Sequence, residues 1–141
     1  MTTQELLELS DRRGYLHLPA DAAGGIDALA VQLPSGRCAW AVERSGISTA
    51  VYRDKVSHEL GHCERSAFYT RFSAPTTREK CEQAAKRWQY RNMVPLSALA
   101  SAIRDGDREA WQIAERIDLP ERLIREAVRY YREALGKAIS P

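Results

Sequence analysis

The chain has 141 residues, of which 44% are hydrophobic and 28% charged, and this composition is typical of a globular protein large enough to bury a core. It carries 21 lysine and arginine residues against 19 aspartate and glutamate residues, and the net charge of +2 indicates neither a polyanionic nor a polycationic partner. The N-terminal segment lacks the apolar stretch of a signal peptide, and no run is long enough to cross a membrane, so we expect a cytoplasmic protein without a membrane partner.

The first third of the chain predicts one short helix and a small sheet. Residues 3–9 begin with threonine and continue with carboxylates and leucines, which predicts a capped helix that ends near Gly14. Three strand-like segments follow, at residues 15–18, 28–33 and 37–43. A Pro-Ser-Gly sequence joins the last two in the manner of a hairpin. We therefore expect an antiparallel sheet of about three strands.

A His-Glu-x-x-His motif occupies residues 58–62, inside a helix predicted over 49–63. Residues four apart share one face of a helix, so His58 and His62 can direct two imidazole nitrogens at a single ion. Glu59 would stand beside the open position of that ion, where a carboxylate can take a proton from a water molecule that Zn²⁺ activates. The motif predicts a zinc site for peptide-bond hydrolysis. The alternative is that all three are ordinary polar residues on a solvated helix.

A hydrolytic zinc site needs a third protein ligand as well as an open position. A helix predicted from residue 77 to just before Pro95 carries two candidates, Glu82 and Glu79, which lie one turn apart on much the same face. His17 is the remaining histidine. It lies on a predicted strand among apolar neighbours, where a hydrogen-bonded or half-exposed histidine is the commoner case, so we do not expect it to be a ligand.

The segment between these two helices, residues 66–77, is rich in aromatic residues and has no clear period, which predicts a loop over the site. Tyr69 is the candidate in this loop for donating a hydrogen bond to the oxyanion of a tetrahedral intermediate. The alternative is that its ring only packs.

Three cysteines, Cys38, Cys63 and Cys81, are an odd number without the spacing of a disulfide scaffold, which fits a reducing compartment. Cys63 and Cys81 adjoin the candidate ligands. Either could be a soft zinc ligand or a redox-active thiol, but we expect small apolar residues packed near the site.

The remaining third, residues 96–141, is predicted to be almost entirely helical, with breaks at 105–107 and 118–120. It reads as a subdomain resembling a helix-turn-helix, packed on a core of residues 1–95 as a single unit. Its arginines fall close to one stripe that could meet phosphates, at Arg122, Arg125, Arg129 and Arg132. Because glutamates interleave with them, we expect a solvated, salt-bridged face and no direct nucleic-acid binding.

The motif at 58–62, followed by a Glu-x-x-Ala helix from Glu82 that ends at Pro95, resembles the ImmA/IrrE family of metallo-endopeptidases, closest to the short type of phages and mobile elements. The Ser-Ala-Phe-Tyr sequence at 66–69 and the Ala-Val-Arg-Tyr-Tyr sequence at 127–131 lie where that pattern places them. The resemblance implies an α+β fold, with a small sheet packed on the zinc-binding helix and a mostly helical C-terminal third. It also implies that His58, His62 and Glu82 ligate Zn²⁺ and that Glu59 is the general base.

Lys86 departs from this pattern, because it stands where such families usually show Asn or Asp. A lysine cannot accept a hydrogen bond from a histidine N–H. The acceptor that orients a ligating imidazole must therefore be another group, such as Asp54, a backbone carbonyl or water. Ser57 is a milder departure, since a small apolar residue is usual there.

Members of the resembled family act on helix-turn-helix repressors, relieving repression of a mobile element or a stress response. The resemblance implies limited cleavage of such a repressor as the function. The competing hypothesis is a module that binds a repressor without cleaving it, in which the zinc is structural or absent. For the enzyme, we expect the substrate to enter as an extended segment that pairs with a sheet edge.

Overall fold

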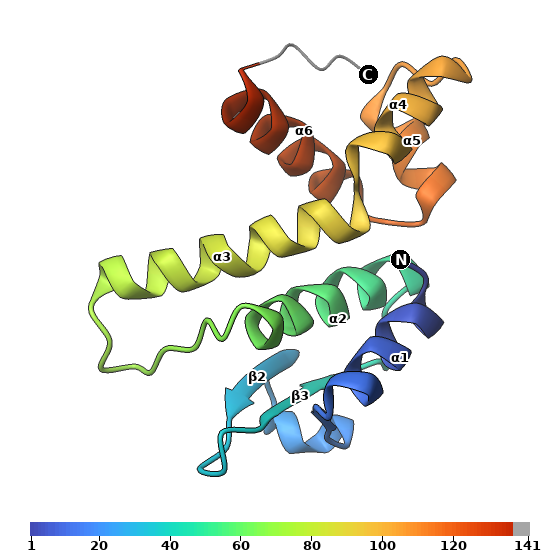
Figure 1. Ribbon diagram of the computed structural model, residues 1–141. Coiled ribbons are helices and arrows are strands. Elements are labelled where there is room, and N and C mark those ends of the chain that lie inside the picture. Colours follow the sequence, from blue (N-terminus) through green and yellow to red (C-terminus); the bar gives the residue numbers. More distant parts are fainter. Residues whose placement is uncertain (137–141) are drawn as a thin grey trace.

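The computed structural model describes residues 1–136, which form an α+β fold of three strands, six α-helices and one short 3-10 helix (Figure 1). The elements in chain order are α1 (Thr3–Arg13), β1 (Leu16–His17), η1 (Ala20–Ala23), β2 (Ala28–Gln32), β3 (Cys38–Val42), α2 (Thr49–Glu64), α3 (Pro75–Met93), α4 (Leu96–Arg104), α5 (Ala110–Ile117) and α6 (Glu121–Leu135). The α+β class, the helical C-terminal part and the helix that carries the motif are as the sequence predicts. Within the described residues, no helix is both long and apolar enough to cross a membrane.

The sheet is mixed rather than wholly antiparallel, which corrects the prediction from sequence. Its order is β1-β3-β2, with β2 antiparallel and β1 parallel to the central strand β3. Between β1 and β2 the chain passes through η1 to the opposite edge of β3, so β1 runs in the same direction as β3. All five residues of β3 are buried, as expected of a central strand.

The helix α2 lies between the sheet and α3, so the molecule is built in layers (Figure 1). Its first turn is capped by Ser48, whose hydroxyl oxygen accepts a hydrogen bond from the backbone N–H of Val51. Leu60 and Val56 face the core and are fully buried. The motif therefore lies on a helix that is covered on two sides, which fixes the position of its side chains.

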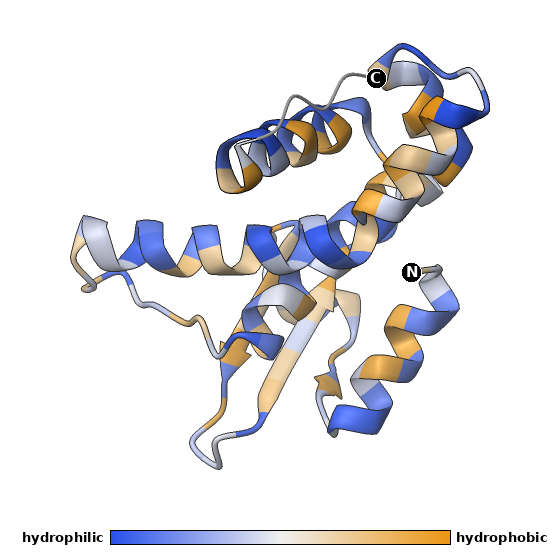
Figure 2. Cartoon of the chain, turned by 45° about the horizontal axis from the view of Figure 1, so that its top comes forward, coloured by the Kyte–Doolittle hydropathy of each residue, from blue (hydrophilic) through white to orange (hydrophobic). Residues whose placement is uncertain are grey.

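The C-terminal helices share one buried cluster with the rest of the chain. Leu123 and Ile124 of α6 belong to the same cluster as Leu60 of α2. The Tyr131 hydroxyl lies 3.2 Å and 2.9 Å from the carbonyl oxygens of Tyr90 and Val94, which joins α6 to the end of α3. Helix α6 carries polar residues on one side and apolar residues on the other, and this amphipathic pattern accounts for its packing (Figure 2).

The buried side chain of Arg53 connects α2 to two distant segments. Its Nη1 atom donates hydrogen bonds to the carbonyl oxygens of Ile117 and Asp118, in the turn between α5 and α6. Its Nη2 atom donates to the carbonyl oxygen of Met1. Asp118 adopts a left-handed backbone conformation, with φ of 54°, which turns its carbonyl group toward the arginine.

Candidate metal centre

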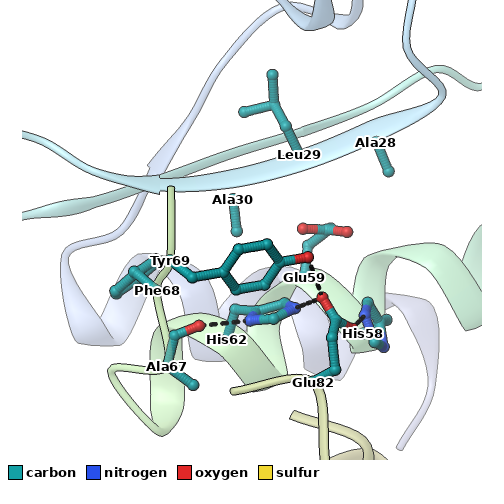
Figure 3. A pocket seen from close by; sticks show the side chains of 10 residues that line it. All are labelled: Ala28, Leu29, Ala30, His58, Glu59, His62, Ala67, Phe68, Tyr69 and Glu82. Carbon is teal, nitrogen blue, oxygen red and sulfur yellow. Dashed lines mark hydrogen bonds and ion pairs between the residues drawn. The ribbon is translucent and has the colours of Figure 1, made fainter. Parts of the chain in front are cut away.

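The side chains of His58 and His62 from α2 meet that of Glu82 from α3 (Figure 3). The Nε2 atom of His58 lies 3.0 Å from Oε2 of Glu82, and Nε2 of His62 lies 3.3 Å from Oε1 of the same carboxylate. The possible ligand atoms of the three residues all lie within 4.8 Å of one another, so this group could hold a metal ion. The group lines a cavity of about 230 Å³ together with Glu59 and Tyr69.

A backbone carbonyl fixes the orientation of His62. Its Nδ1 atom lies 2.6 Å from the oxygen of Ala67, and because a carbonyl only accepts hydrogen bonds, Nδ1 carries the proton. The lone pair of Nε2 then faces the Glu82 carboxylate, and two acceptors at this distance repel unless a proton or a cation lies between them. Among the acceptors that the sequence left open, a carbonyl serves His62. Asp54 instead accepts from Gln89 and Arg122.

A close approach of two helices brings Glu82 to the histidines. Gly61 of α2 packs against Ala85 of α3 so tightly that a Cβ atom on the glycine would lie 2.6 Å from the Ala85 carbonyl oxygen. Ala85 is fully buried and lies three residues after Glu82, on the same side of α3. In the sequence, Gly61 occupies one of the variable positions of the motif. A glycine within a helix, where it weakens helical stability, was the available indication of a packing contact.

A buried polar network joins the same two helices one turn earlier on α2. The Gln89 amide nitrogen lies 2.7 Å from Oδ1 of Asp54 and 2.9 Å from the hydroxyl oxygen of Ser57. Ser57 is fully buried and donates to the carbonyl oxygen of Asp54. These bonds explain why a serine is accommodated where a small apolar residue was expected. They also join α3 to the antiparallel α2 along the approach to the candidate metal ligands.

Burial and neighbouring charges set the proton affinities of the ligand group. Burial lowers the pKa of His58, and the charge of His62 acts in the same direction, while Glu82 opposes both. Burial disfavours ionisation of Glu82, but the hydrogen bond from Tyr69 and the charges of the two histidines outweigh it, so the pKa of Glu82 is lowered. These shifts favour a neutral His58 imidazole and an ionised Glu82 carboxylate, which are the forms that bind a metal.

Glu59 lines the same cavity and is not part of the ligand group. Burial raises the pKa of its carboxyl group to about 7, and the negative charge of Glu82 adds to the effect. Its carboxylate lies on the side of the cavity toward β2 (Figure 3). A carboxyl group whose pKa lies near neutrality can both accept and return a proton, which suits acid-base chemistry.

Tyr69 extends from the loop between α2 and α3 across the cavity (Figure 3). Its hydroxyl donates a 2.7 Å hydrogen bond to Oε1 of Glu82, and this bond raises the pKa of the Tyr69 phenol to about 12. The side chain is 41% exposed. The aromatic loop over the site is as predicted, with α3 beginning at Pro75, two residues earlier than expected. The hydroxyl contacts a candidate metal ligand, an interaction that the sequence does not predict.

The two other candidate ligands lie elsewhere. Glu79 belongs to no metal-ligand group among the described residues, and its carboxylate accepts a hydrogen bond from Gln83 at 2.9 Å. His17 stacks on Trp40, with ring centroids 3.9 Å apart and planes inclined by 7°. Burial lowers the pKa of His17. It lies on the outer strand β1.

The structure pairs Cys38, at the start of β3, with Cys63, near the end of α2, in a disulfide whose Cα atoms are 5.7 Å apart. Cys63 is therefore not the free apolar residue that the sequence predicts, because the fold brings a strand and a helix end together. Cys81 is free, and its sulfur lies 3.6 Å from the Phe68 carbonyl oxygen. Disulfides persist mainly in oxidising compartments, so the cysteines do not support a reducing one. A cytoplasmic location stays a prediction.

No family model matches the chain, and no curated protein or solved structure matches it either. The fold and the site together define an α+β protein with a His₂Glu group that could hold a metal ion. The resemblance to ImmA/IrrE peptidases remains a prediction that rests on the motifs.

Proposed function

We propose that this protein is a zinc-dependent endopeptidase that makes limited cuts in a helix-turn-helix repressor. The observation that carries the proposal is that His58, His62 and Glu82 meet in one cavity with a partly buried Glu59 beside them. Two ligands and the carboxylate come from a His-Glu-x-x-His motif, whose spacing is that of zinc peptidases. The ImmA/IrrE resemblance supplies the substrate class and the setting in a mobile element or a stress response.

The donor set fits zinc. Two imidazole nitrogens and one carboxylate are typical ligands of a catalytic zinc ion, and they leave one position open. Ligand atoms about 2.1 Å from an ion in tetrahedral geometry lie about 3.4 Å apart. The contacts of 3.0 Å and 3.3 Å between the histidine nitrogens and Glu82 are close to that separation. When bound, zinc would supply a Lewis acid that polarises the peptide carbonyl.

Residues of the chain itself would then transfer the protons, orient the His62 ring and stabilise the oxyanion. Glu59 accepts the proton of the attacking water and returns it to the leaving amine, a role for which a pKa of about 7 is suited. The Ala67 carbonyl holds the His62 ring in the tautomer that keeps Nε2 available. Tyr69 lies where its phenol can leave Glu82 and donate to the developing oxyanion.

Strand β2 offers a place for an extended substrate. It lies at an edge of the sheet, and three of its residues line the cavity, at Ala28, Leu29 and Ala30. The bonds from Glu43 N–H to the Asp27 carbonyl and from Leu33 N–H to the Arg37 carbonyl set the alternation of the ladder. By this alternation Ala28 and Ala30 direct their backbone groups away from β3. A peptide that pairs with them would pass beside Glu59.

The decisive experiment incubates the zinc-loaded protein with a helix-turn-helix repressor, for which the neighbouring reading frame is the first place to look. We expect cleavage at one or two bonds, read by mass spectrometry, and poor digestion of denatured casein. The matched control is Glu59→Gln, which keeps the shape of the side chain but removes the base, and which should bind the repressor without cutting it. Extensive casein digestion with an intact repressor would indicate a broad peptidase instead. Binding without cleavage by both forms would favour the non-proteolytic module.

Metal analysis tests the first step separately. Protein purified without added zinc should contain about one equivalent per chain, since three protein ligands meet at one site. Less than about a tenth of an equivalent, not restored by added zinc, would remove the basis for the enzyme.

A further inference from the structure

A second cavity, of about 380 Å³, lies between the segment that leads into α5 and one face of α6. Four of the residues that line it are arginines, namely Arg108, Arg125, Arg129 and Arg132. Glu109 is the one carboxylate among the lining residues. The formal charge of the lining is therefore +3, from four positive groups and one negative group, in a chain whose net charge is only +2.

The arginines are arranged along the cavity by the helix. Arg125, Arg129 and Arg132 are spaced by four and three residues, so they share one face of α6 and span about 10 Å along its axis. Val128 lies buried at the base of this face, and Ala110 closes the cavity on the α5 side. The arginine face is therefore opposed by a wall, and the exposed guanidinium groups border one common volume that is open to solvent.

Some arginines of the structure are paired with carboxylates. Arg122 is bonded to Asp54 and Glu126, and Arg116 to Asp105 and Asp107. The sequence predicted a salt-bridged face on α6, and this holds for Arg122 and for Arg125, which pairs with Glu121.

Two of the arginines that line the cavity, Arg108 and Arg129, are not paired in this way with a carboxylate of the described residues. Arg108 donates through Nη1 to the carbonyl oxygens of Ile103 and Asp107, which are neutral and leave its other donors available. In residues 1–136 no salt bridge involves Arg108 or Arg129. The positive charge of the cavity is thus only partly compensated.

We propose that this cavity binds a phosphate group. The planar guanidinium presents paired N–H donors that match two phosphate oxygens, and a phosphate carries enough oxygens to engage arginines from both walls at once. The positive end of the α5 dipole lies at the same wall, since Ala110 is the first residue of that helix. The phosphate could belong to a free phosphorylated compound or to the backbone of a nucleic acid. This inference is independent of the proposed peptidase activity.

Titration calorimetry of the full chain tests the proposal with two probes, inorganic pyrophosphate and a short DNA duplex of arbitrary sequence. Arg129→Gln and Arg108→Gln should each weaken binding of the recognised probe about tenfold, since a hydrogen bond to a charged group is lost. Arg12→Gln is the control, because it removes the same charge from an exposed position on α1, far along the chain from the cavity. All three positions are exposed, and unchanged melting temperatures would verify folding.

The outcomes of the titration distinguish a free phosphorylated compound from a nucleic-acid backbone as the source of the phosphate. Binding of pyrophosphate without the duplex assigns a free phosphorylated ligand. If the duplex binds, if pyrophosphate displaces it, and if its affinity falls steeply with salt, the ligand is a phosphodiester backbone. No binding of either probe at millimolar concentration would overturn the proposal. It would equally be overturned if both cavity variants bind like Arg12→Gln, or if a glutamate-rich peptide binds as tightly as pyrophosphate.

Discussion

Gly61 packs directly on Ala85 where the two helices that carry the candidate metal ligands meet, since a Cβ atom at position 61 would lie 2.6 Å from the Ala85 carbonyl oxygen. That oxygen is a backbone atom of a helix and cannot move away alone. The separation of α2 and α3 at the site, and with it the reach of Glu82 to His58 and His62, is therefore set by the absence of a side chain at position 61.

Gly61→Ala should weaken metal binding at least about tenfold, because α3 must shift away and take Glu82 with it. Alanine favours the helix by about 1 kcal/mol over glycine, but overpacking costs about 1 to 3 kcal/mol, so we expect no gain in the free energy of unfolding. Zinc titration and urea denaturation measure the two effects. A variant that binds zinc like the parent and unfolds at a higher urea concentration would show that the helices are not held apart by this contact.

Glu82→Ala should lower zinc affinity by about 100-fold or more. Loss of a residue that only hydrogen-bonds a metal ligand already lowers metal affinity by about 10- to 100-fold, and Glu82 is itself a proposed ligand. Glu79→Ala is the matched control on the same helix, one turn away, and should leave the affinity unchanged. Competition with a chromophoric chelator gives both constants. If the control lost zinc and Glu82→Ala retained it, the third ligand would be Glu79.

Tyr69→Phe should lower zinc affinity about tenfold, because the variant loses the hydroxyl that hydrogen-bonds the Glu82 carboxylate. Turnover at saturating zinc then tests the second proposed role. A fall of about 100-fold is expected if the phenol also donates to the oxyanion. Unchanged zinc affinity together with unchanged turnover would leave ring packing as its only contribution.

Reduction of the Cys38–Cys63 disulfide should lower the free energy of unfolding by about 3 kcal/mol, as expected for a crosslink that closes a loop of about 25 residues. Urea denaturation with and without dithiothreitol measures the change. Cys81→Ala should respond to the reductant like the parent, whereas Cys63→Ala should no longer respond. A denaturation midpoint that dithiothreitol does not alter in the parent would argue that the bond contributes nothing to stability.

Periodicity explains what could be predicted from the sequence. The spacing of His58 and His62 places both on one helical face whatever the rest of the fold, and a helix that returns after a loop of suitable length offers Glu82. The hairpin of β2 and β3 is likewise a local feature, marked by its turn residues. These relations depend on neighbours in the chain, which the sequence shows directly.

The sequence left open which group orients His62, because the acceptor is a backbone carbonyl, that of Ala67, which the choice of residue does not reveal. The features that were missed depend on contacts between distant segments. One such feature is the parallel pairing of β1 with β3, and another is the disulfide between Cys38 and Cys63. Both join residues more than 20 positions apart in the sequence. Gly61 was visible, but its role required the position of Ala85, which only the packing of α2 on α3 supplies.

Arg53 has a consequence for how the chain can change during evolution. Its guanidinium is held by carbonyl oxygens of Met1, Ile117 and Asp118, so the helix with the histidines depends on the turn between α5 and α6 for its acceptors. A recombination event that replaced everything after Pro95 would leave a buried cation short of partners unless the incoming tail brought an equivalent turn. The tail and the motif helix are therefore expected to be inherited together, and a fragment cut between them would lose stability in both halves.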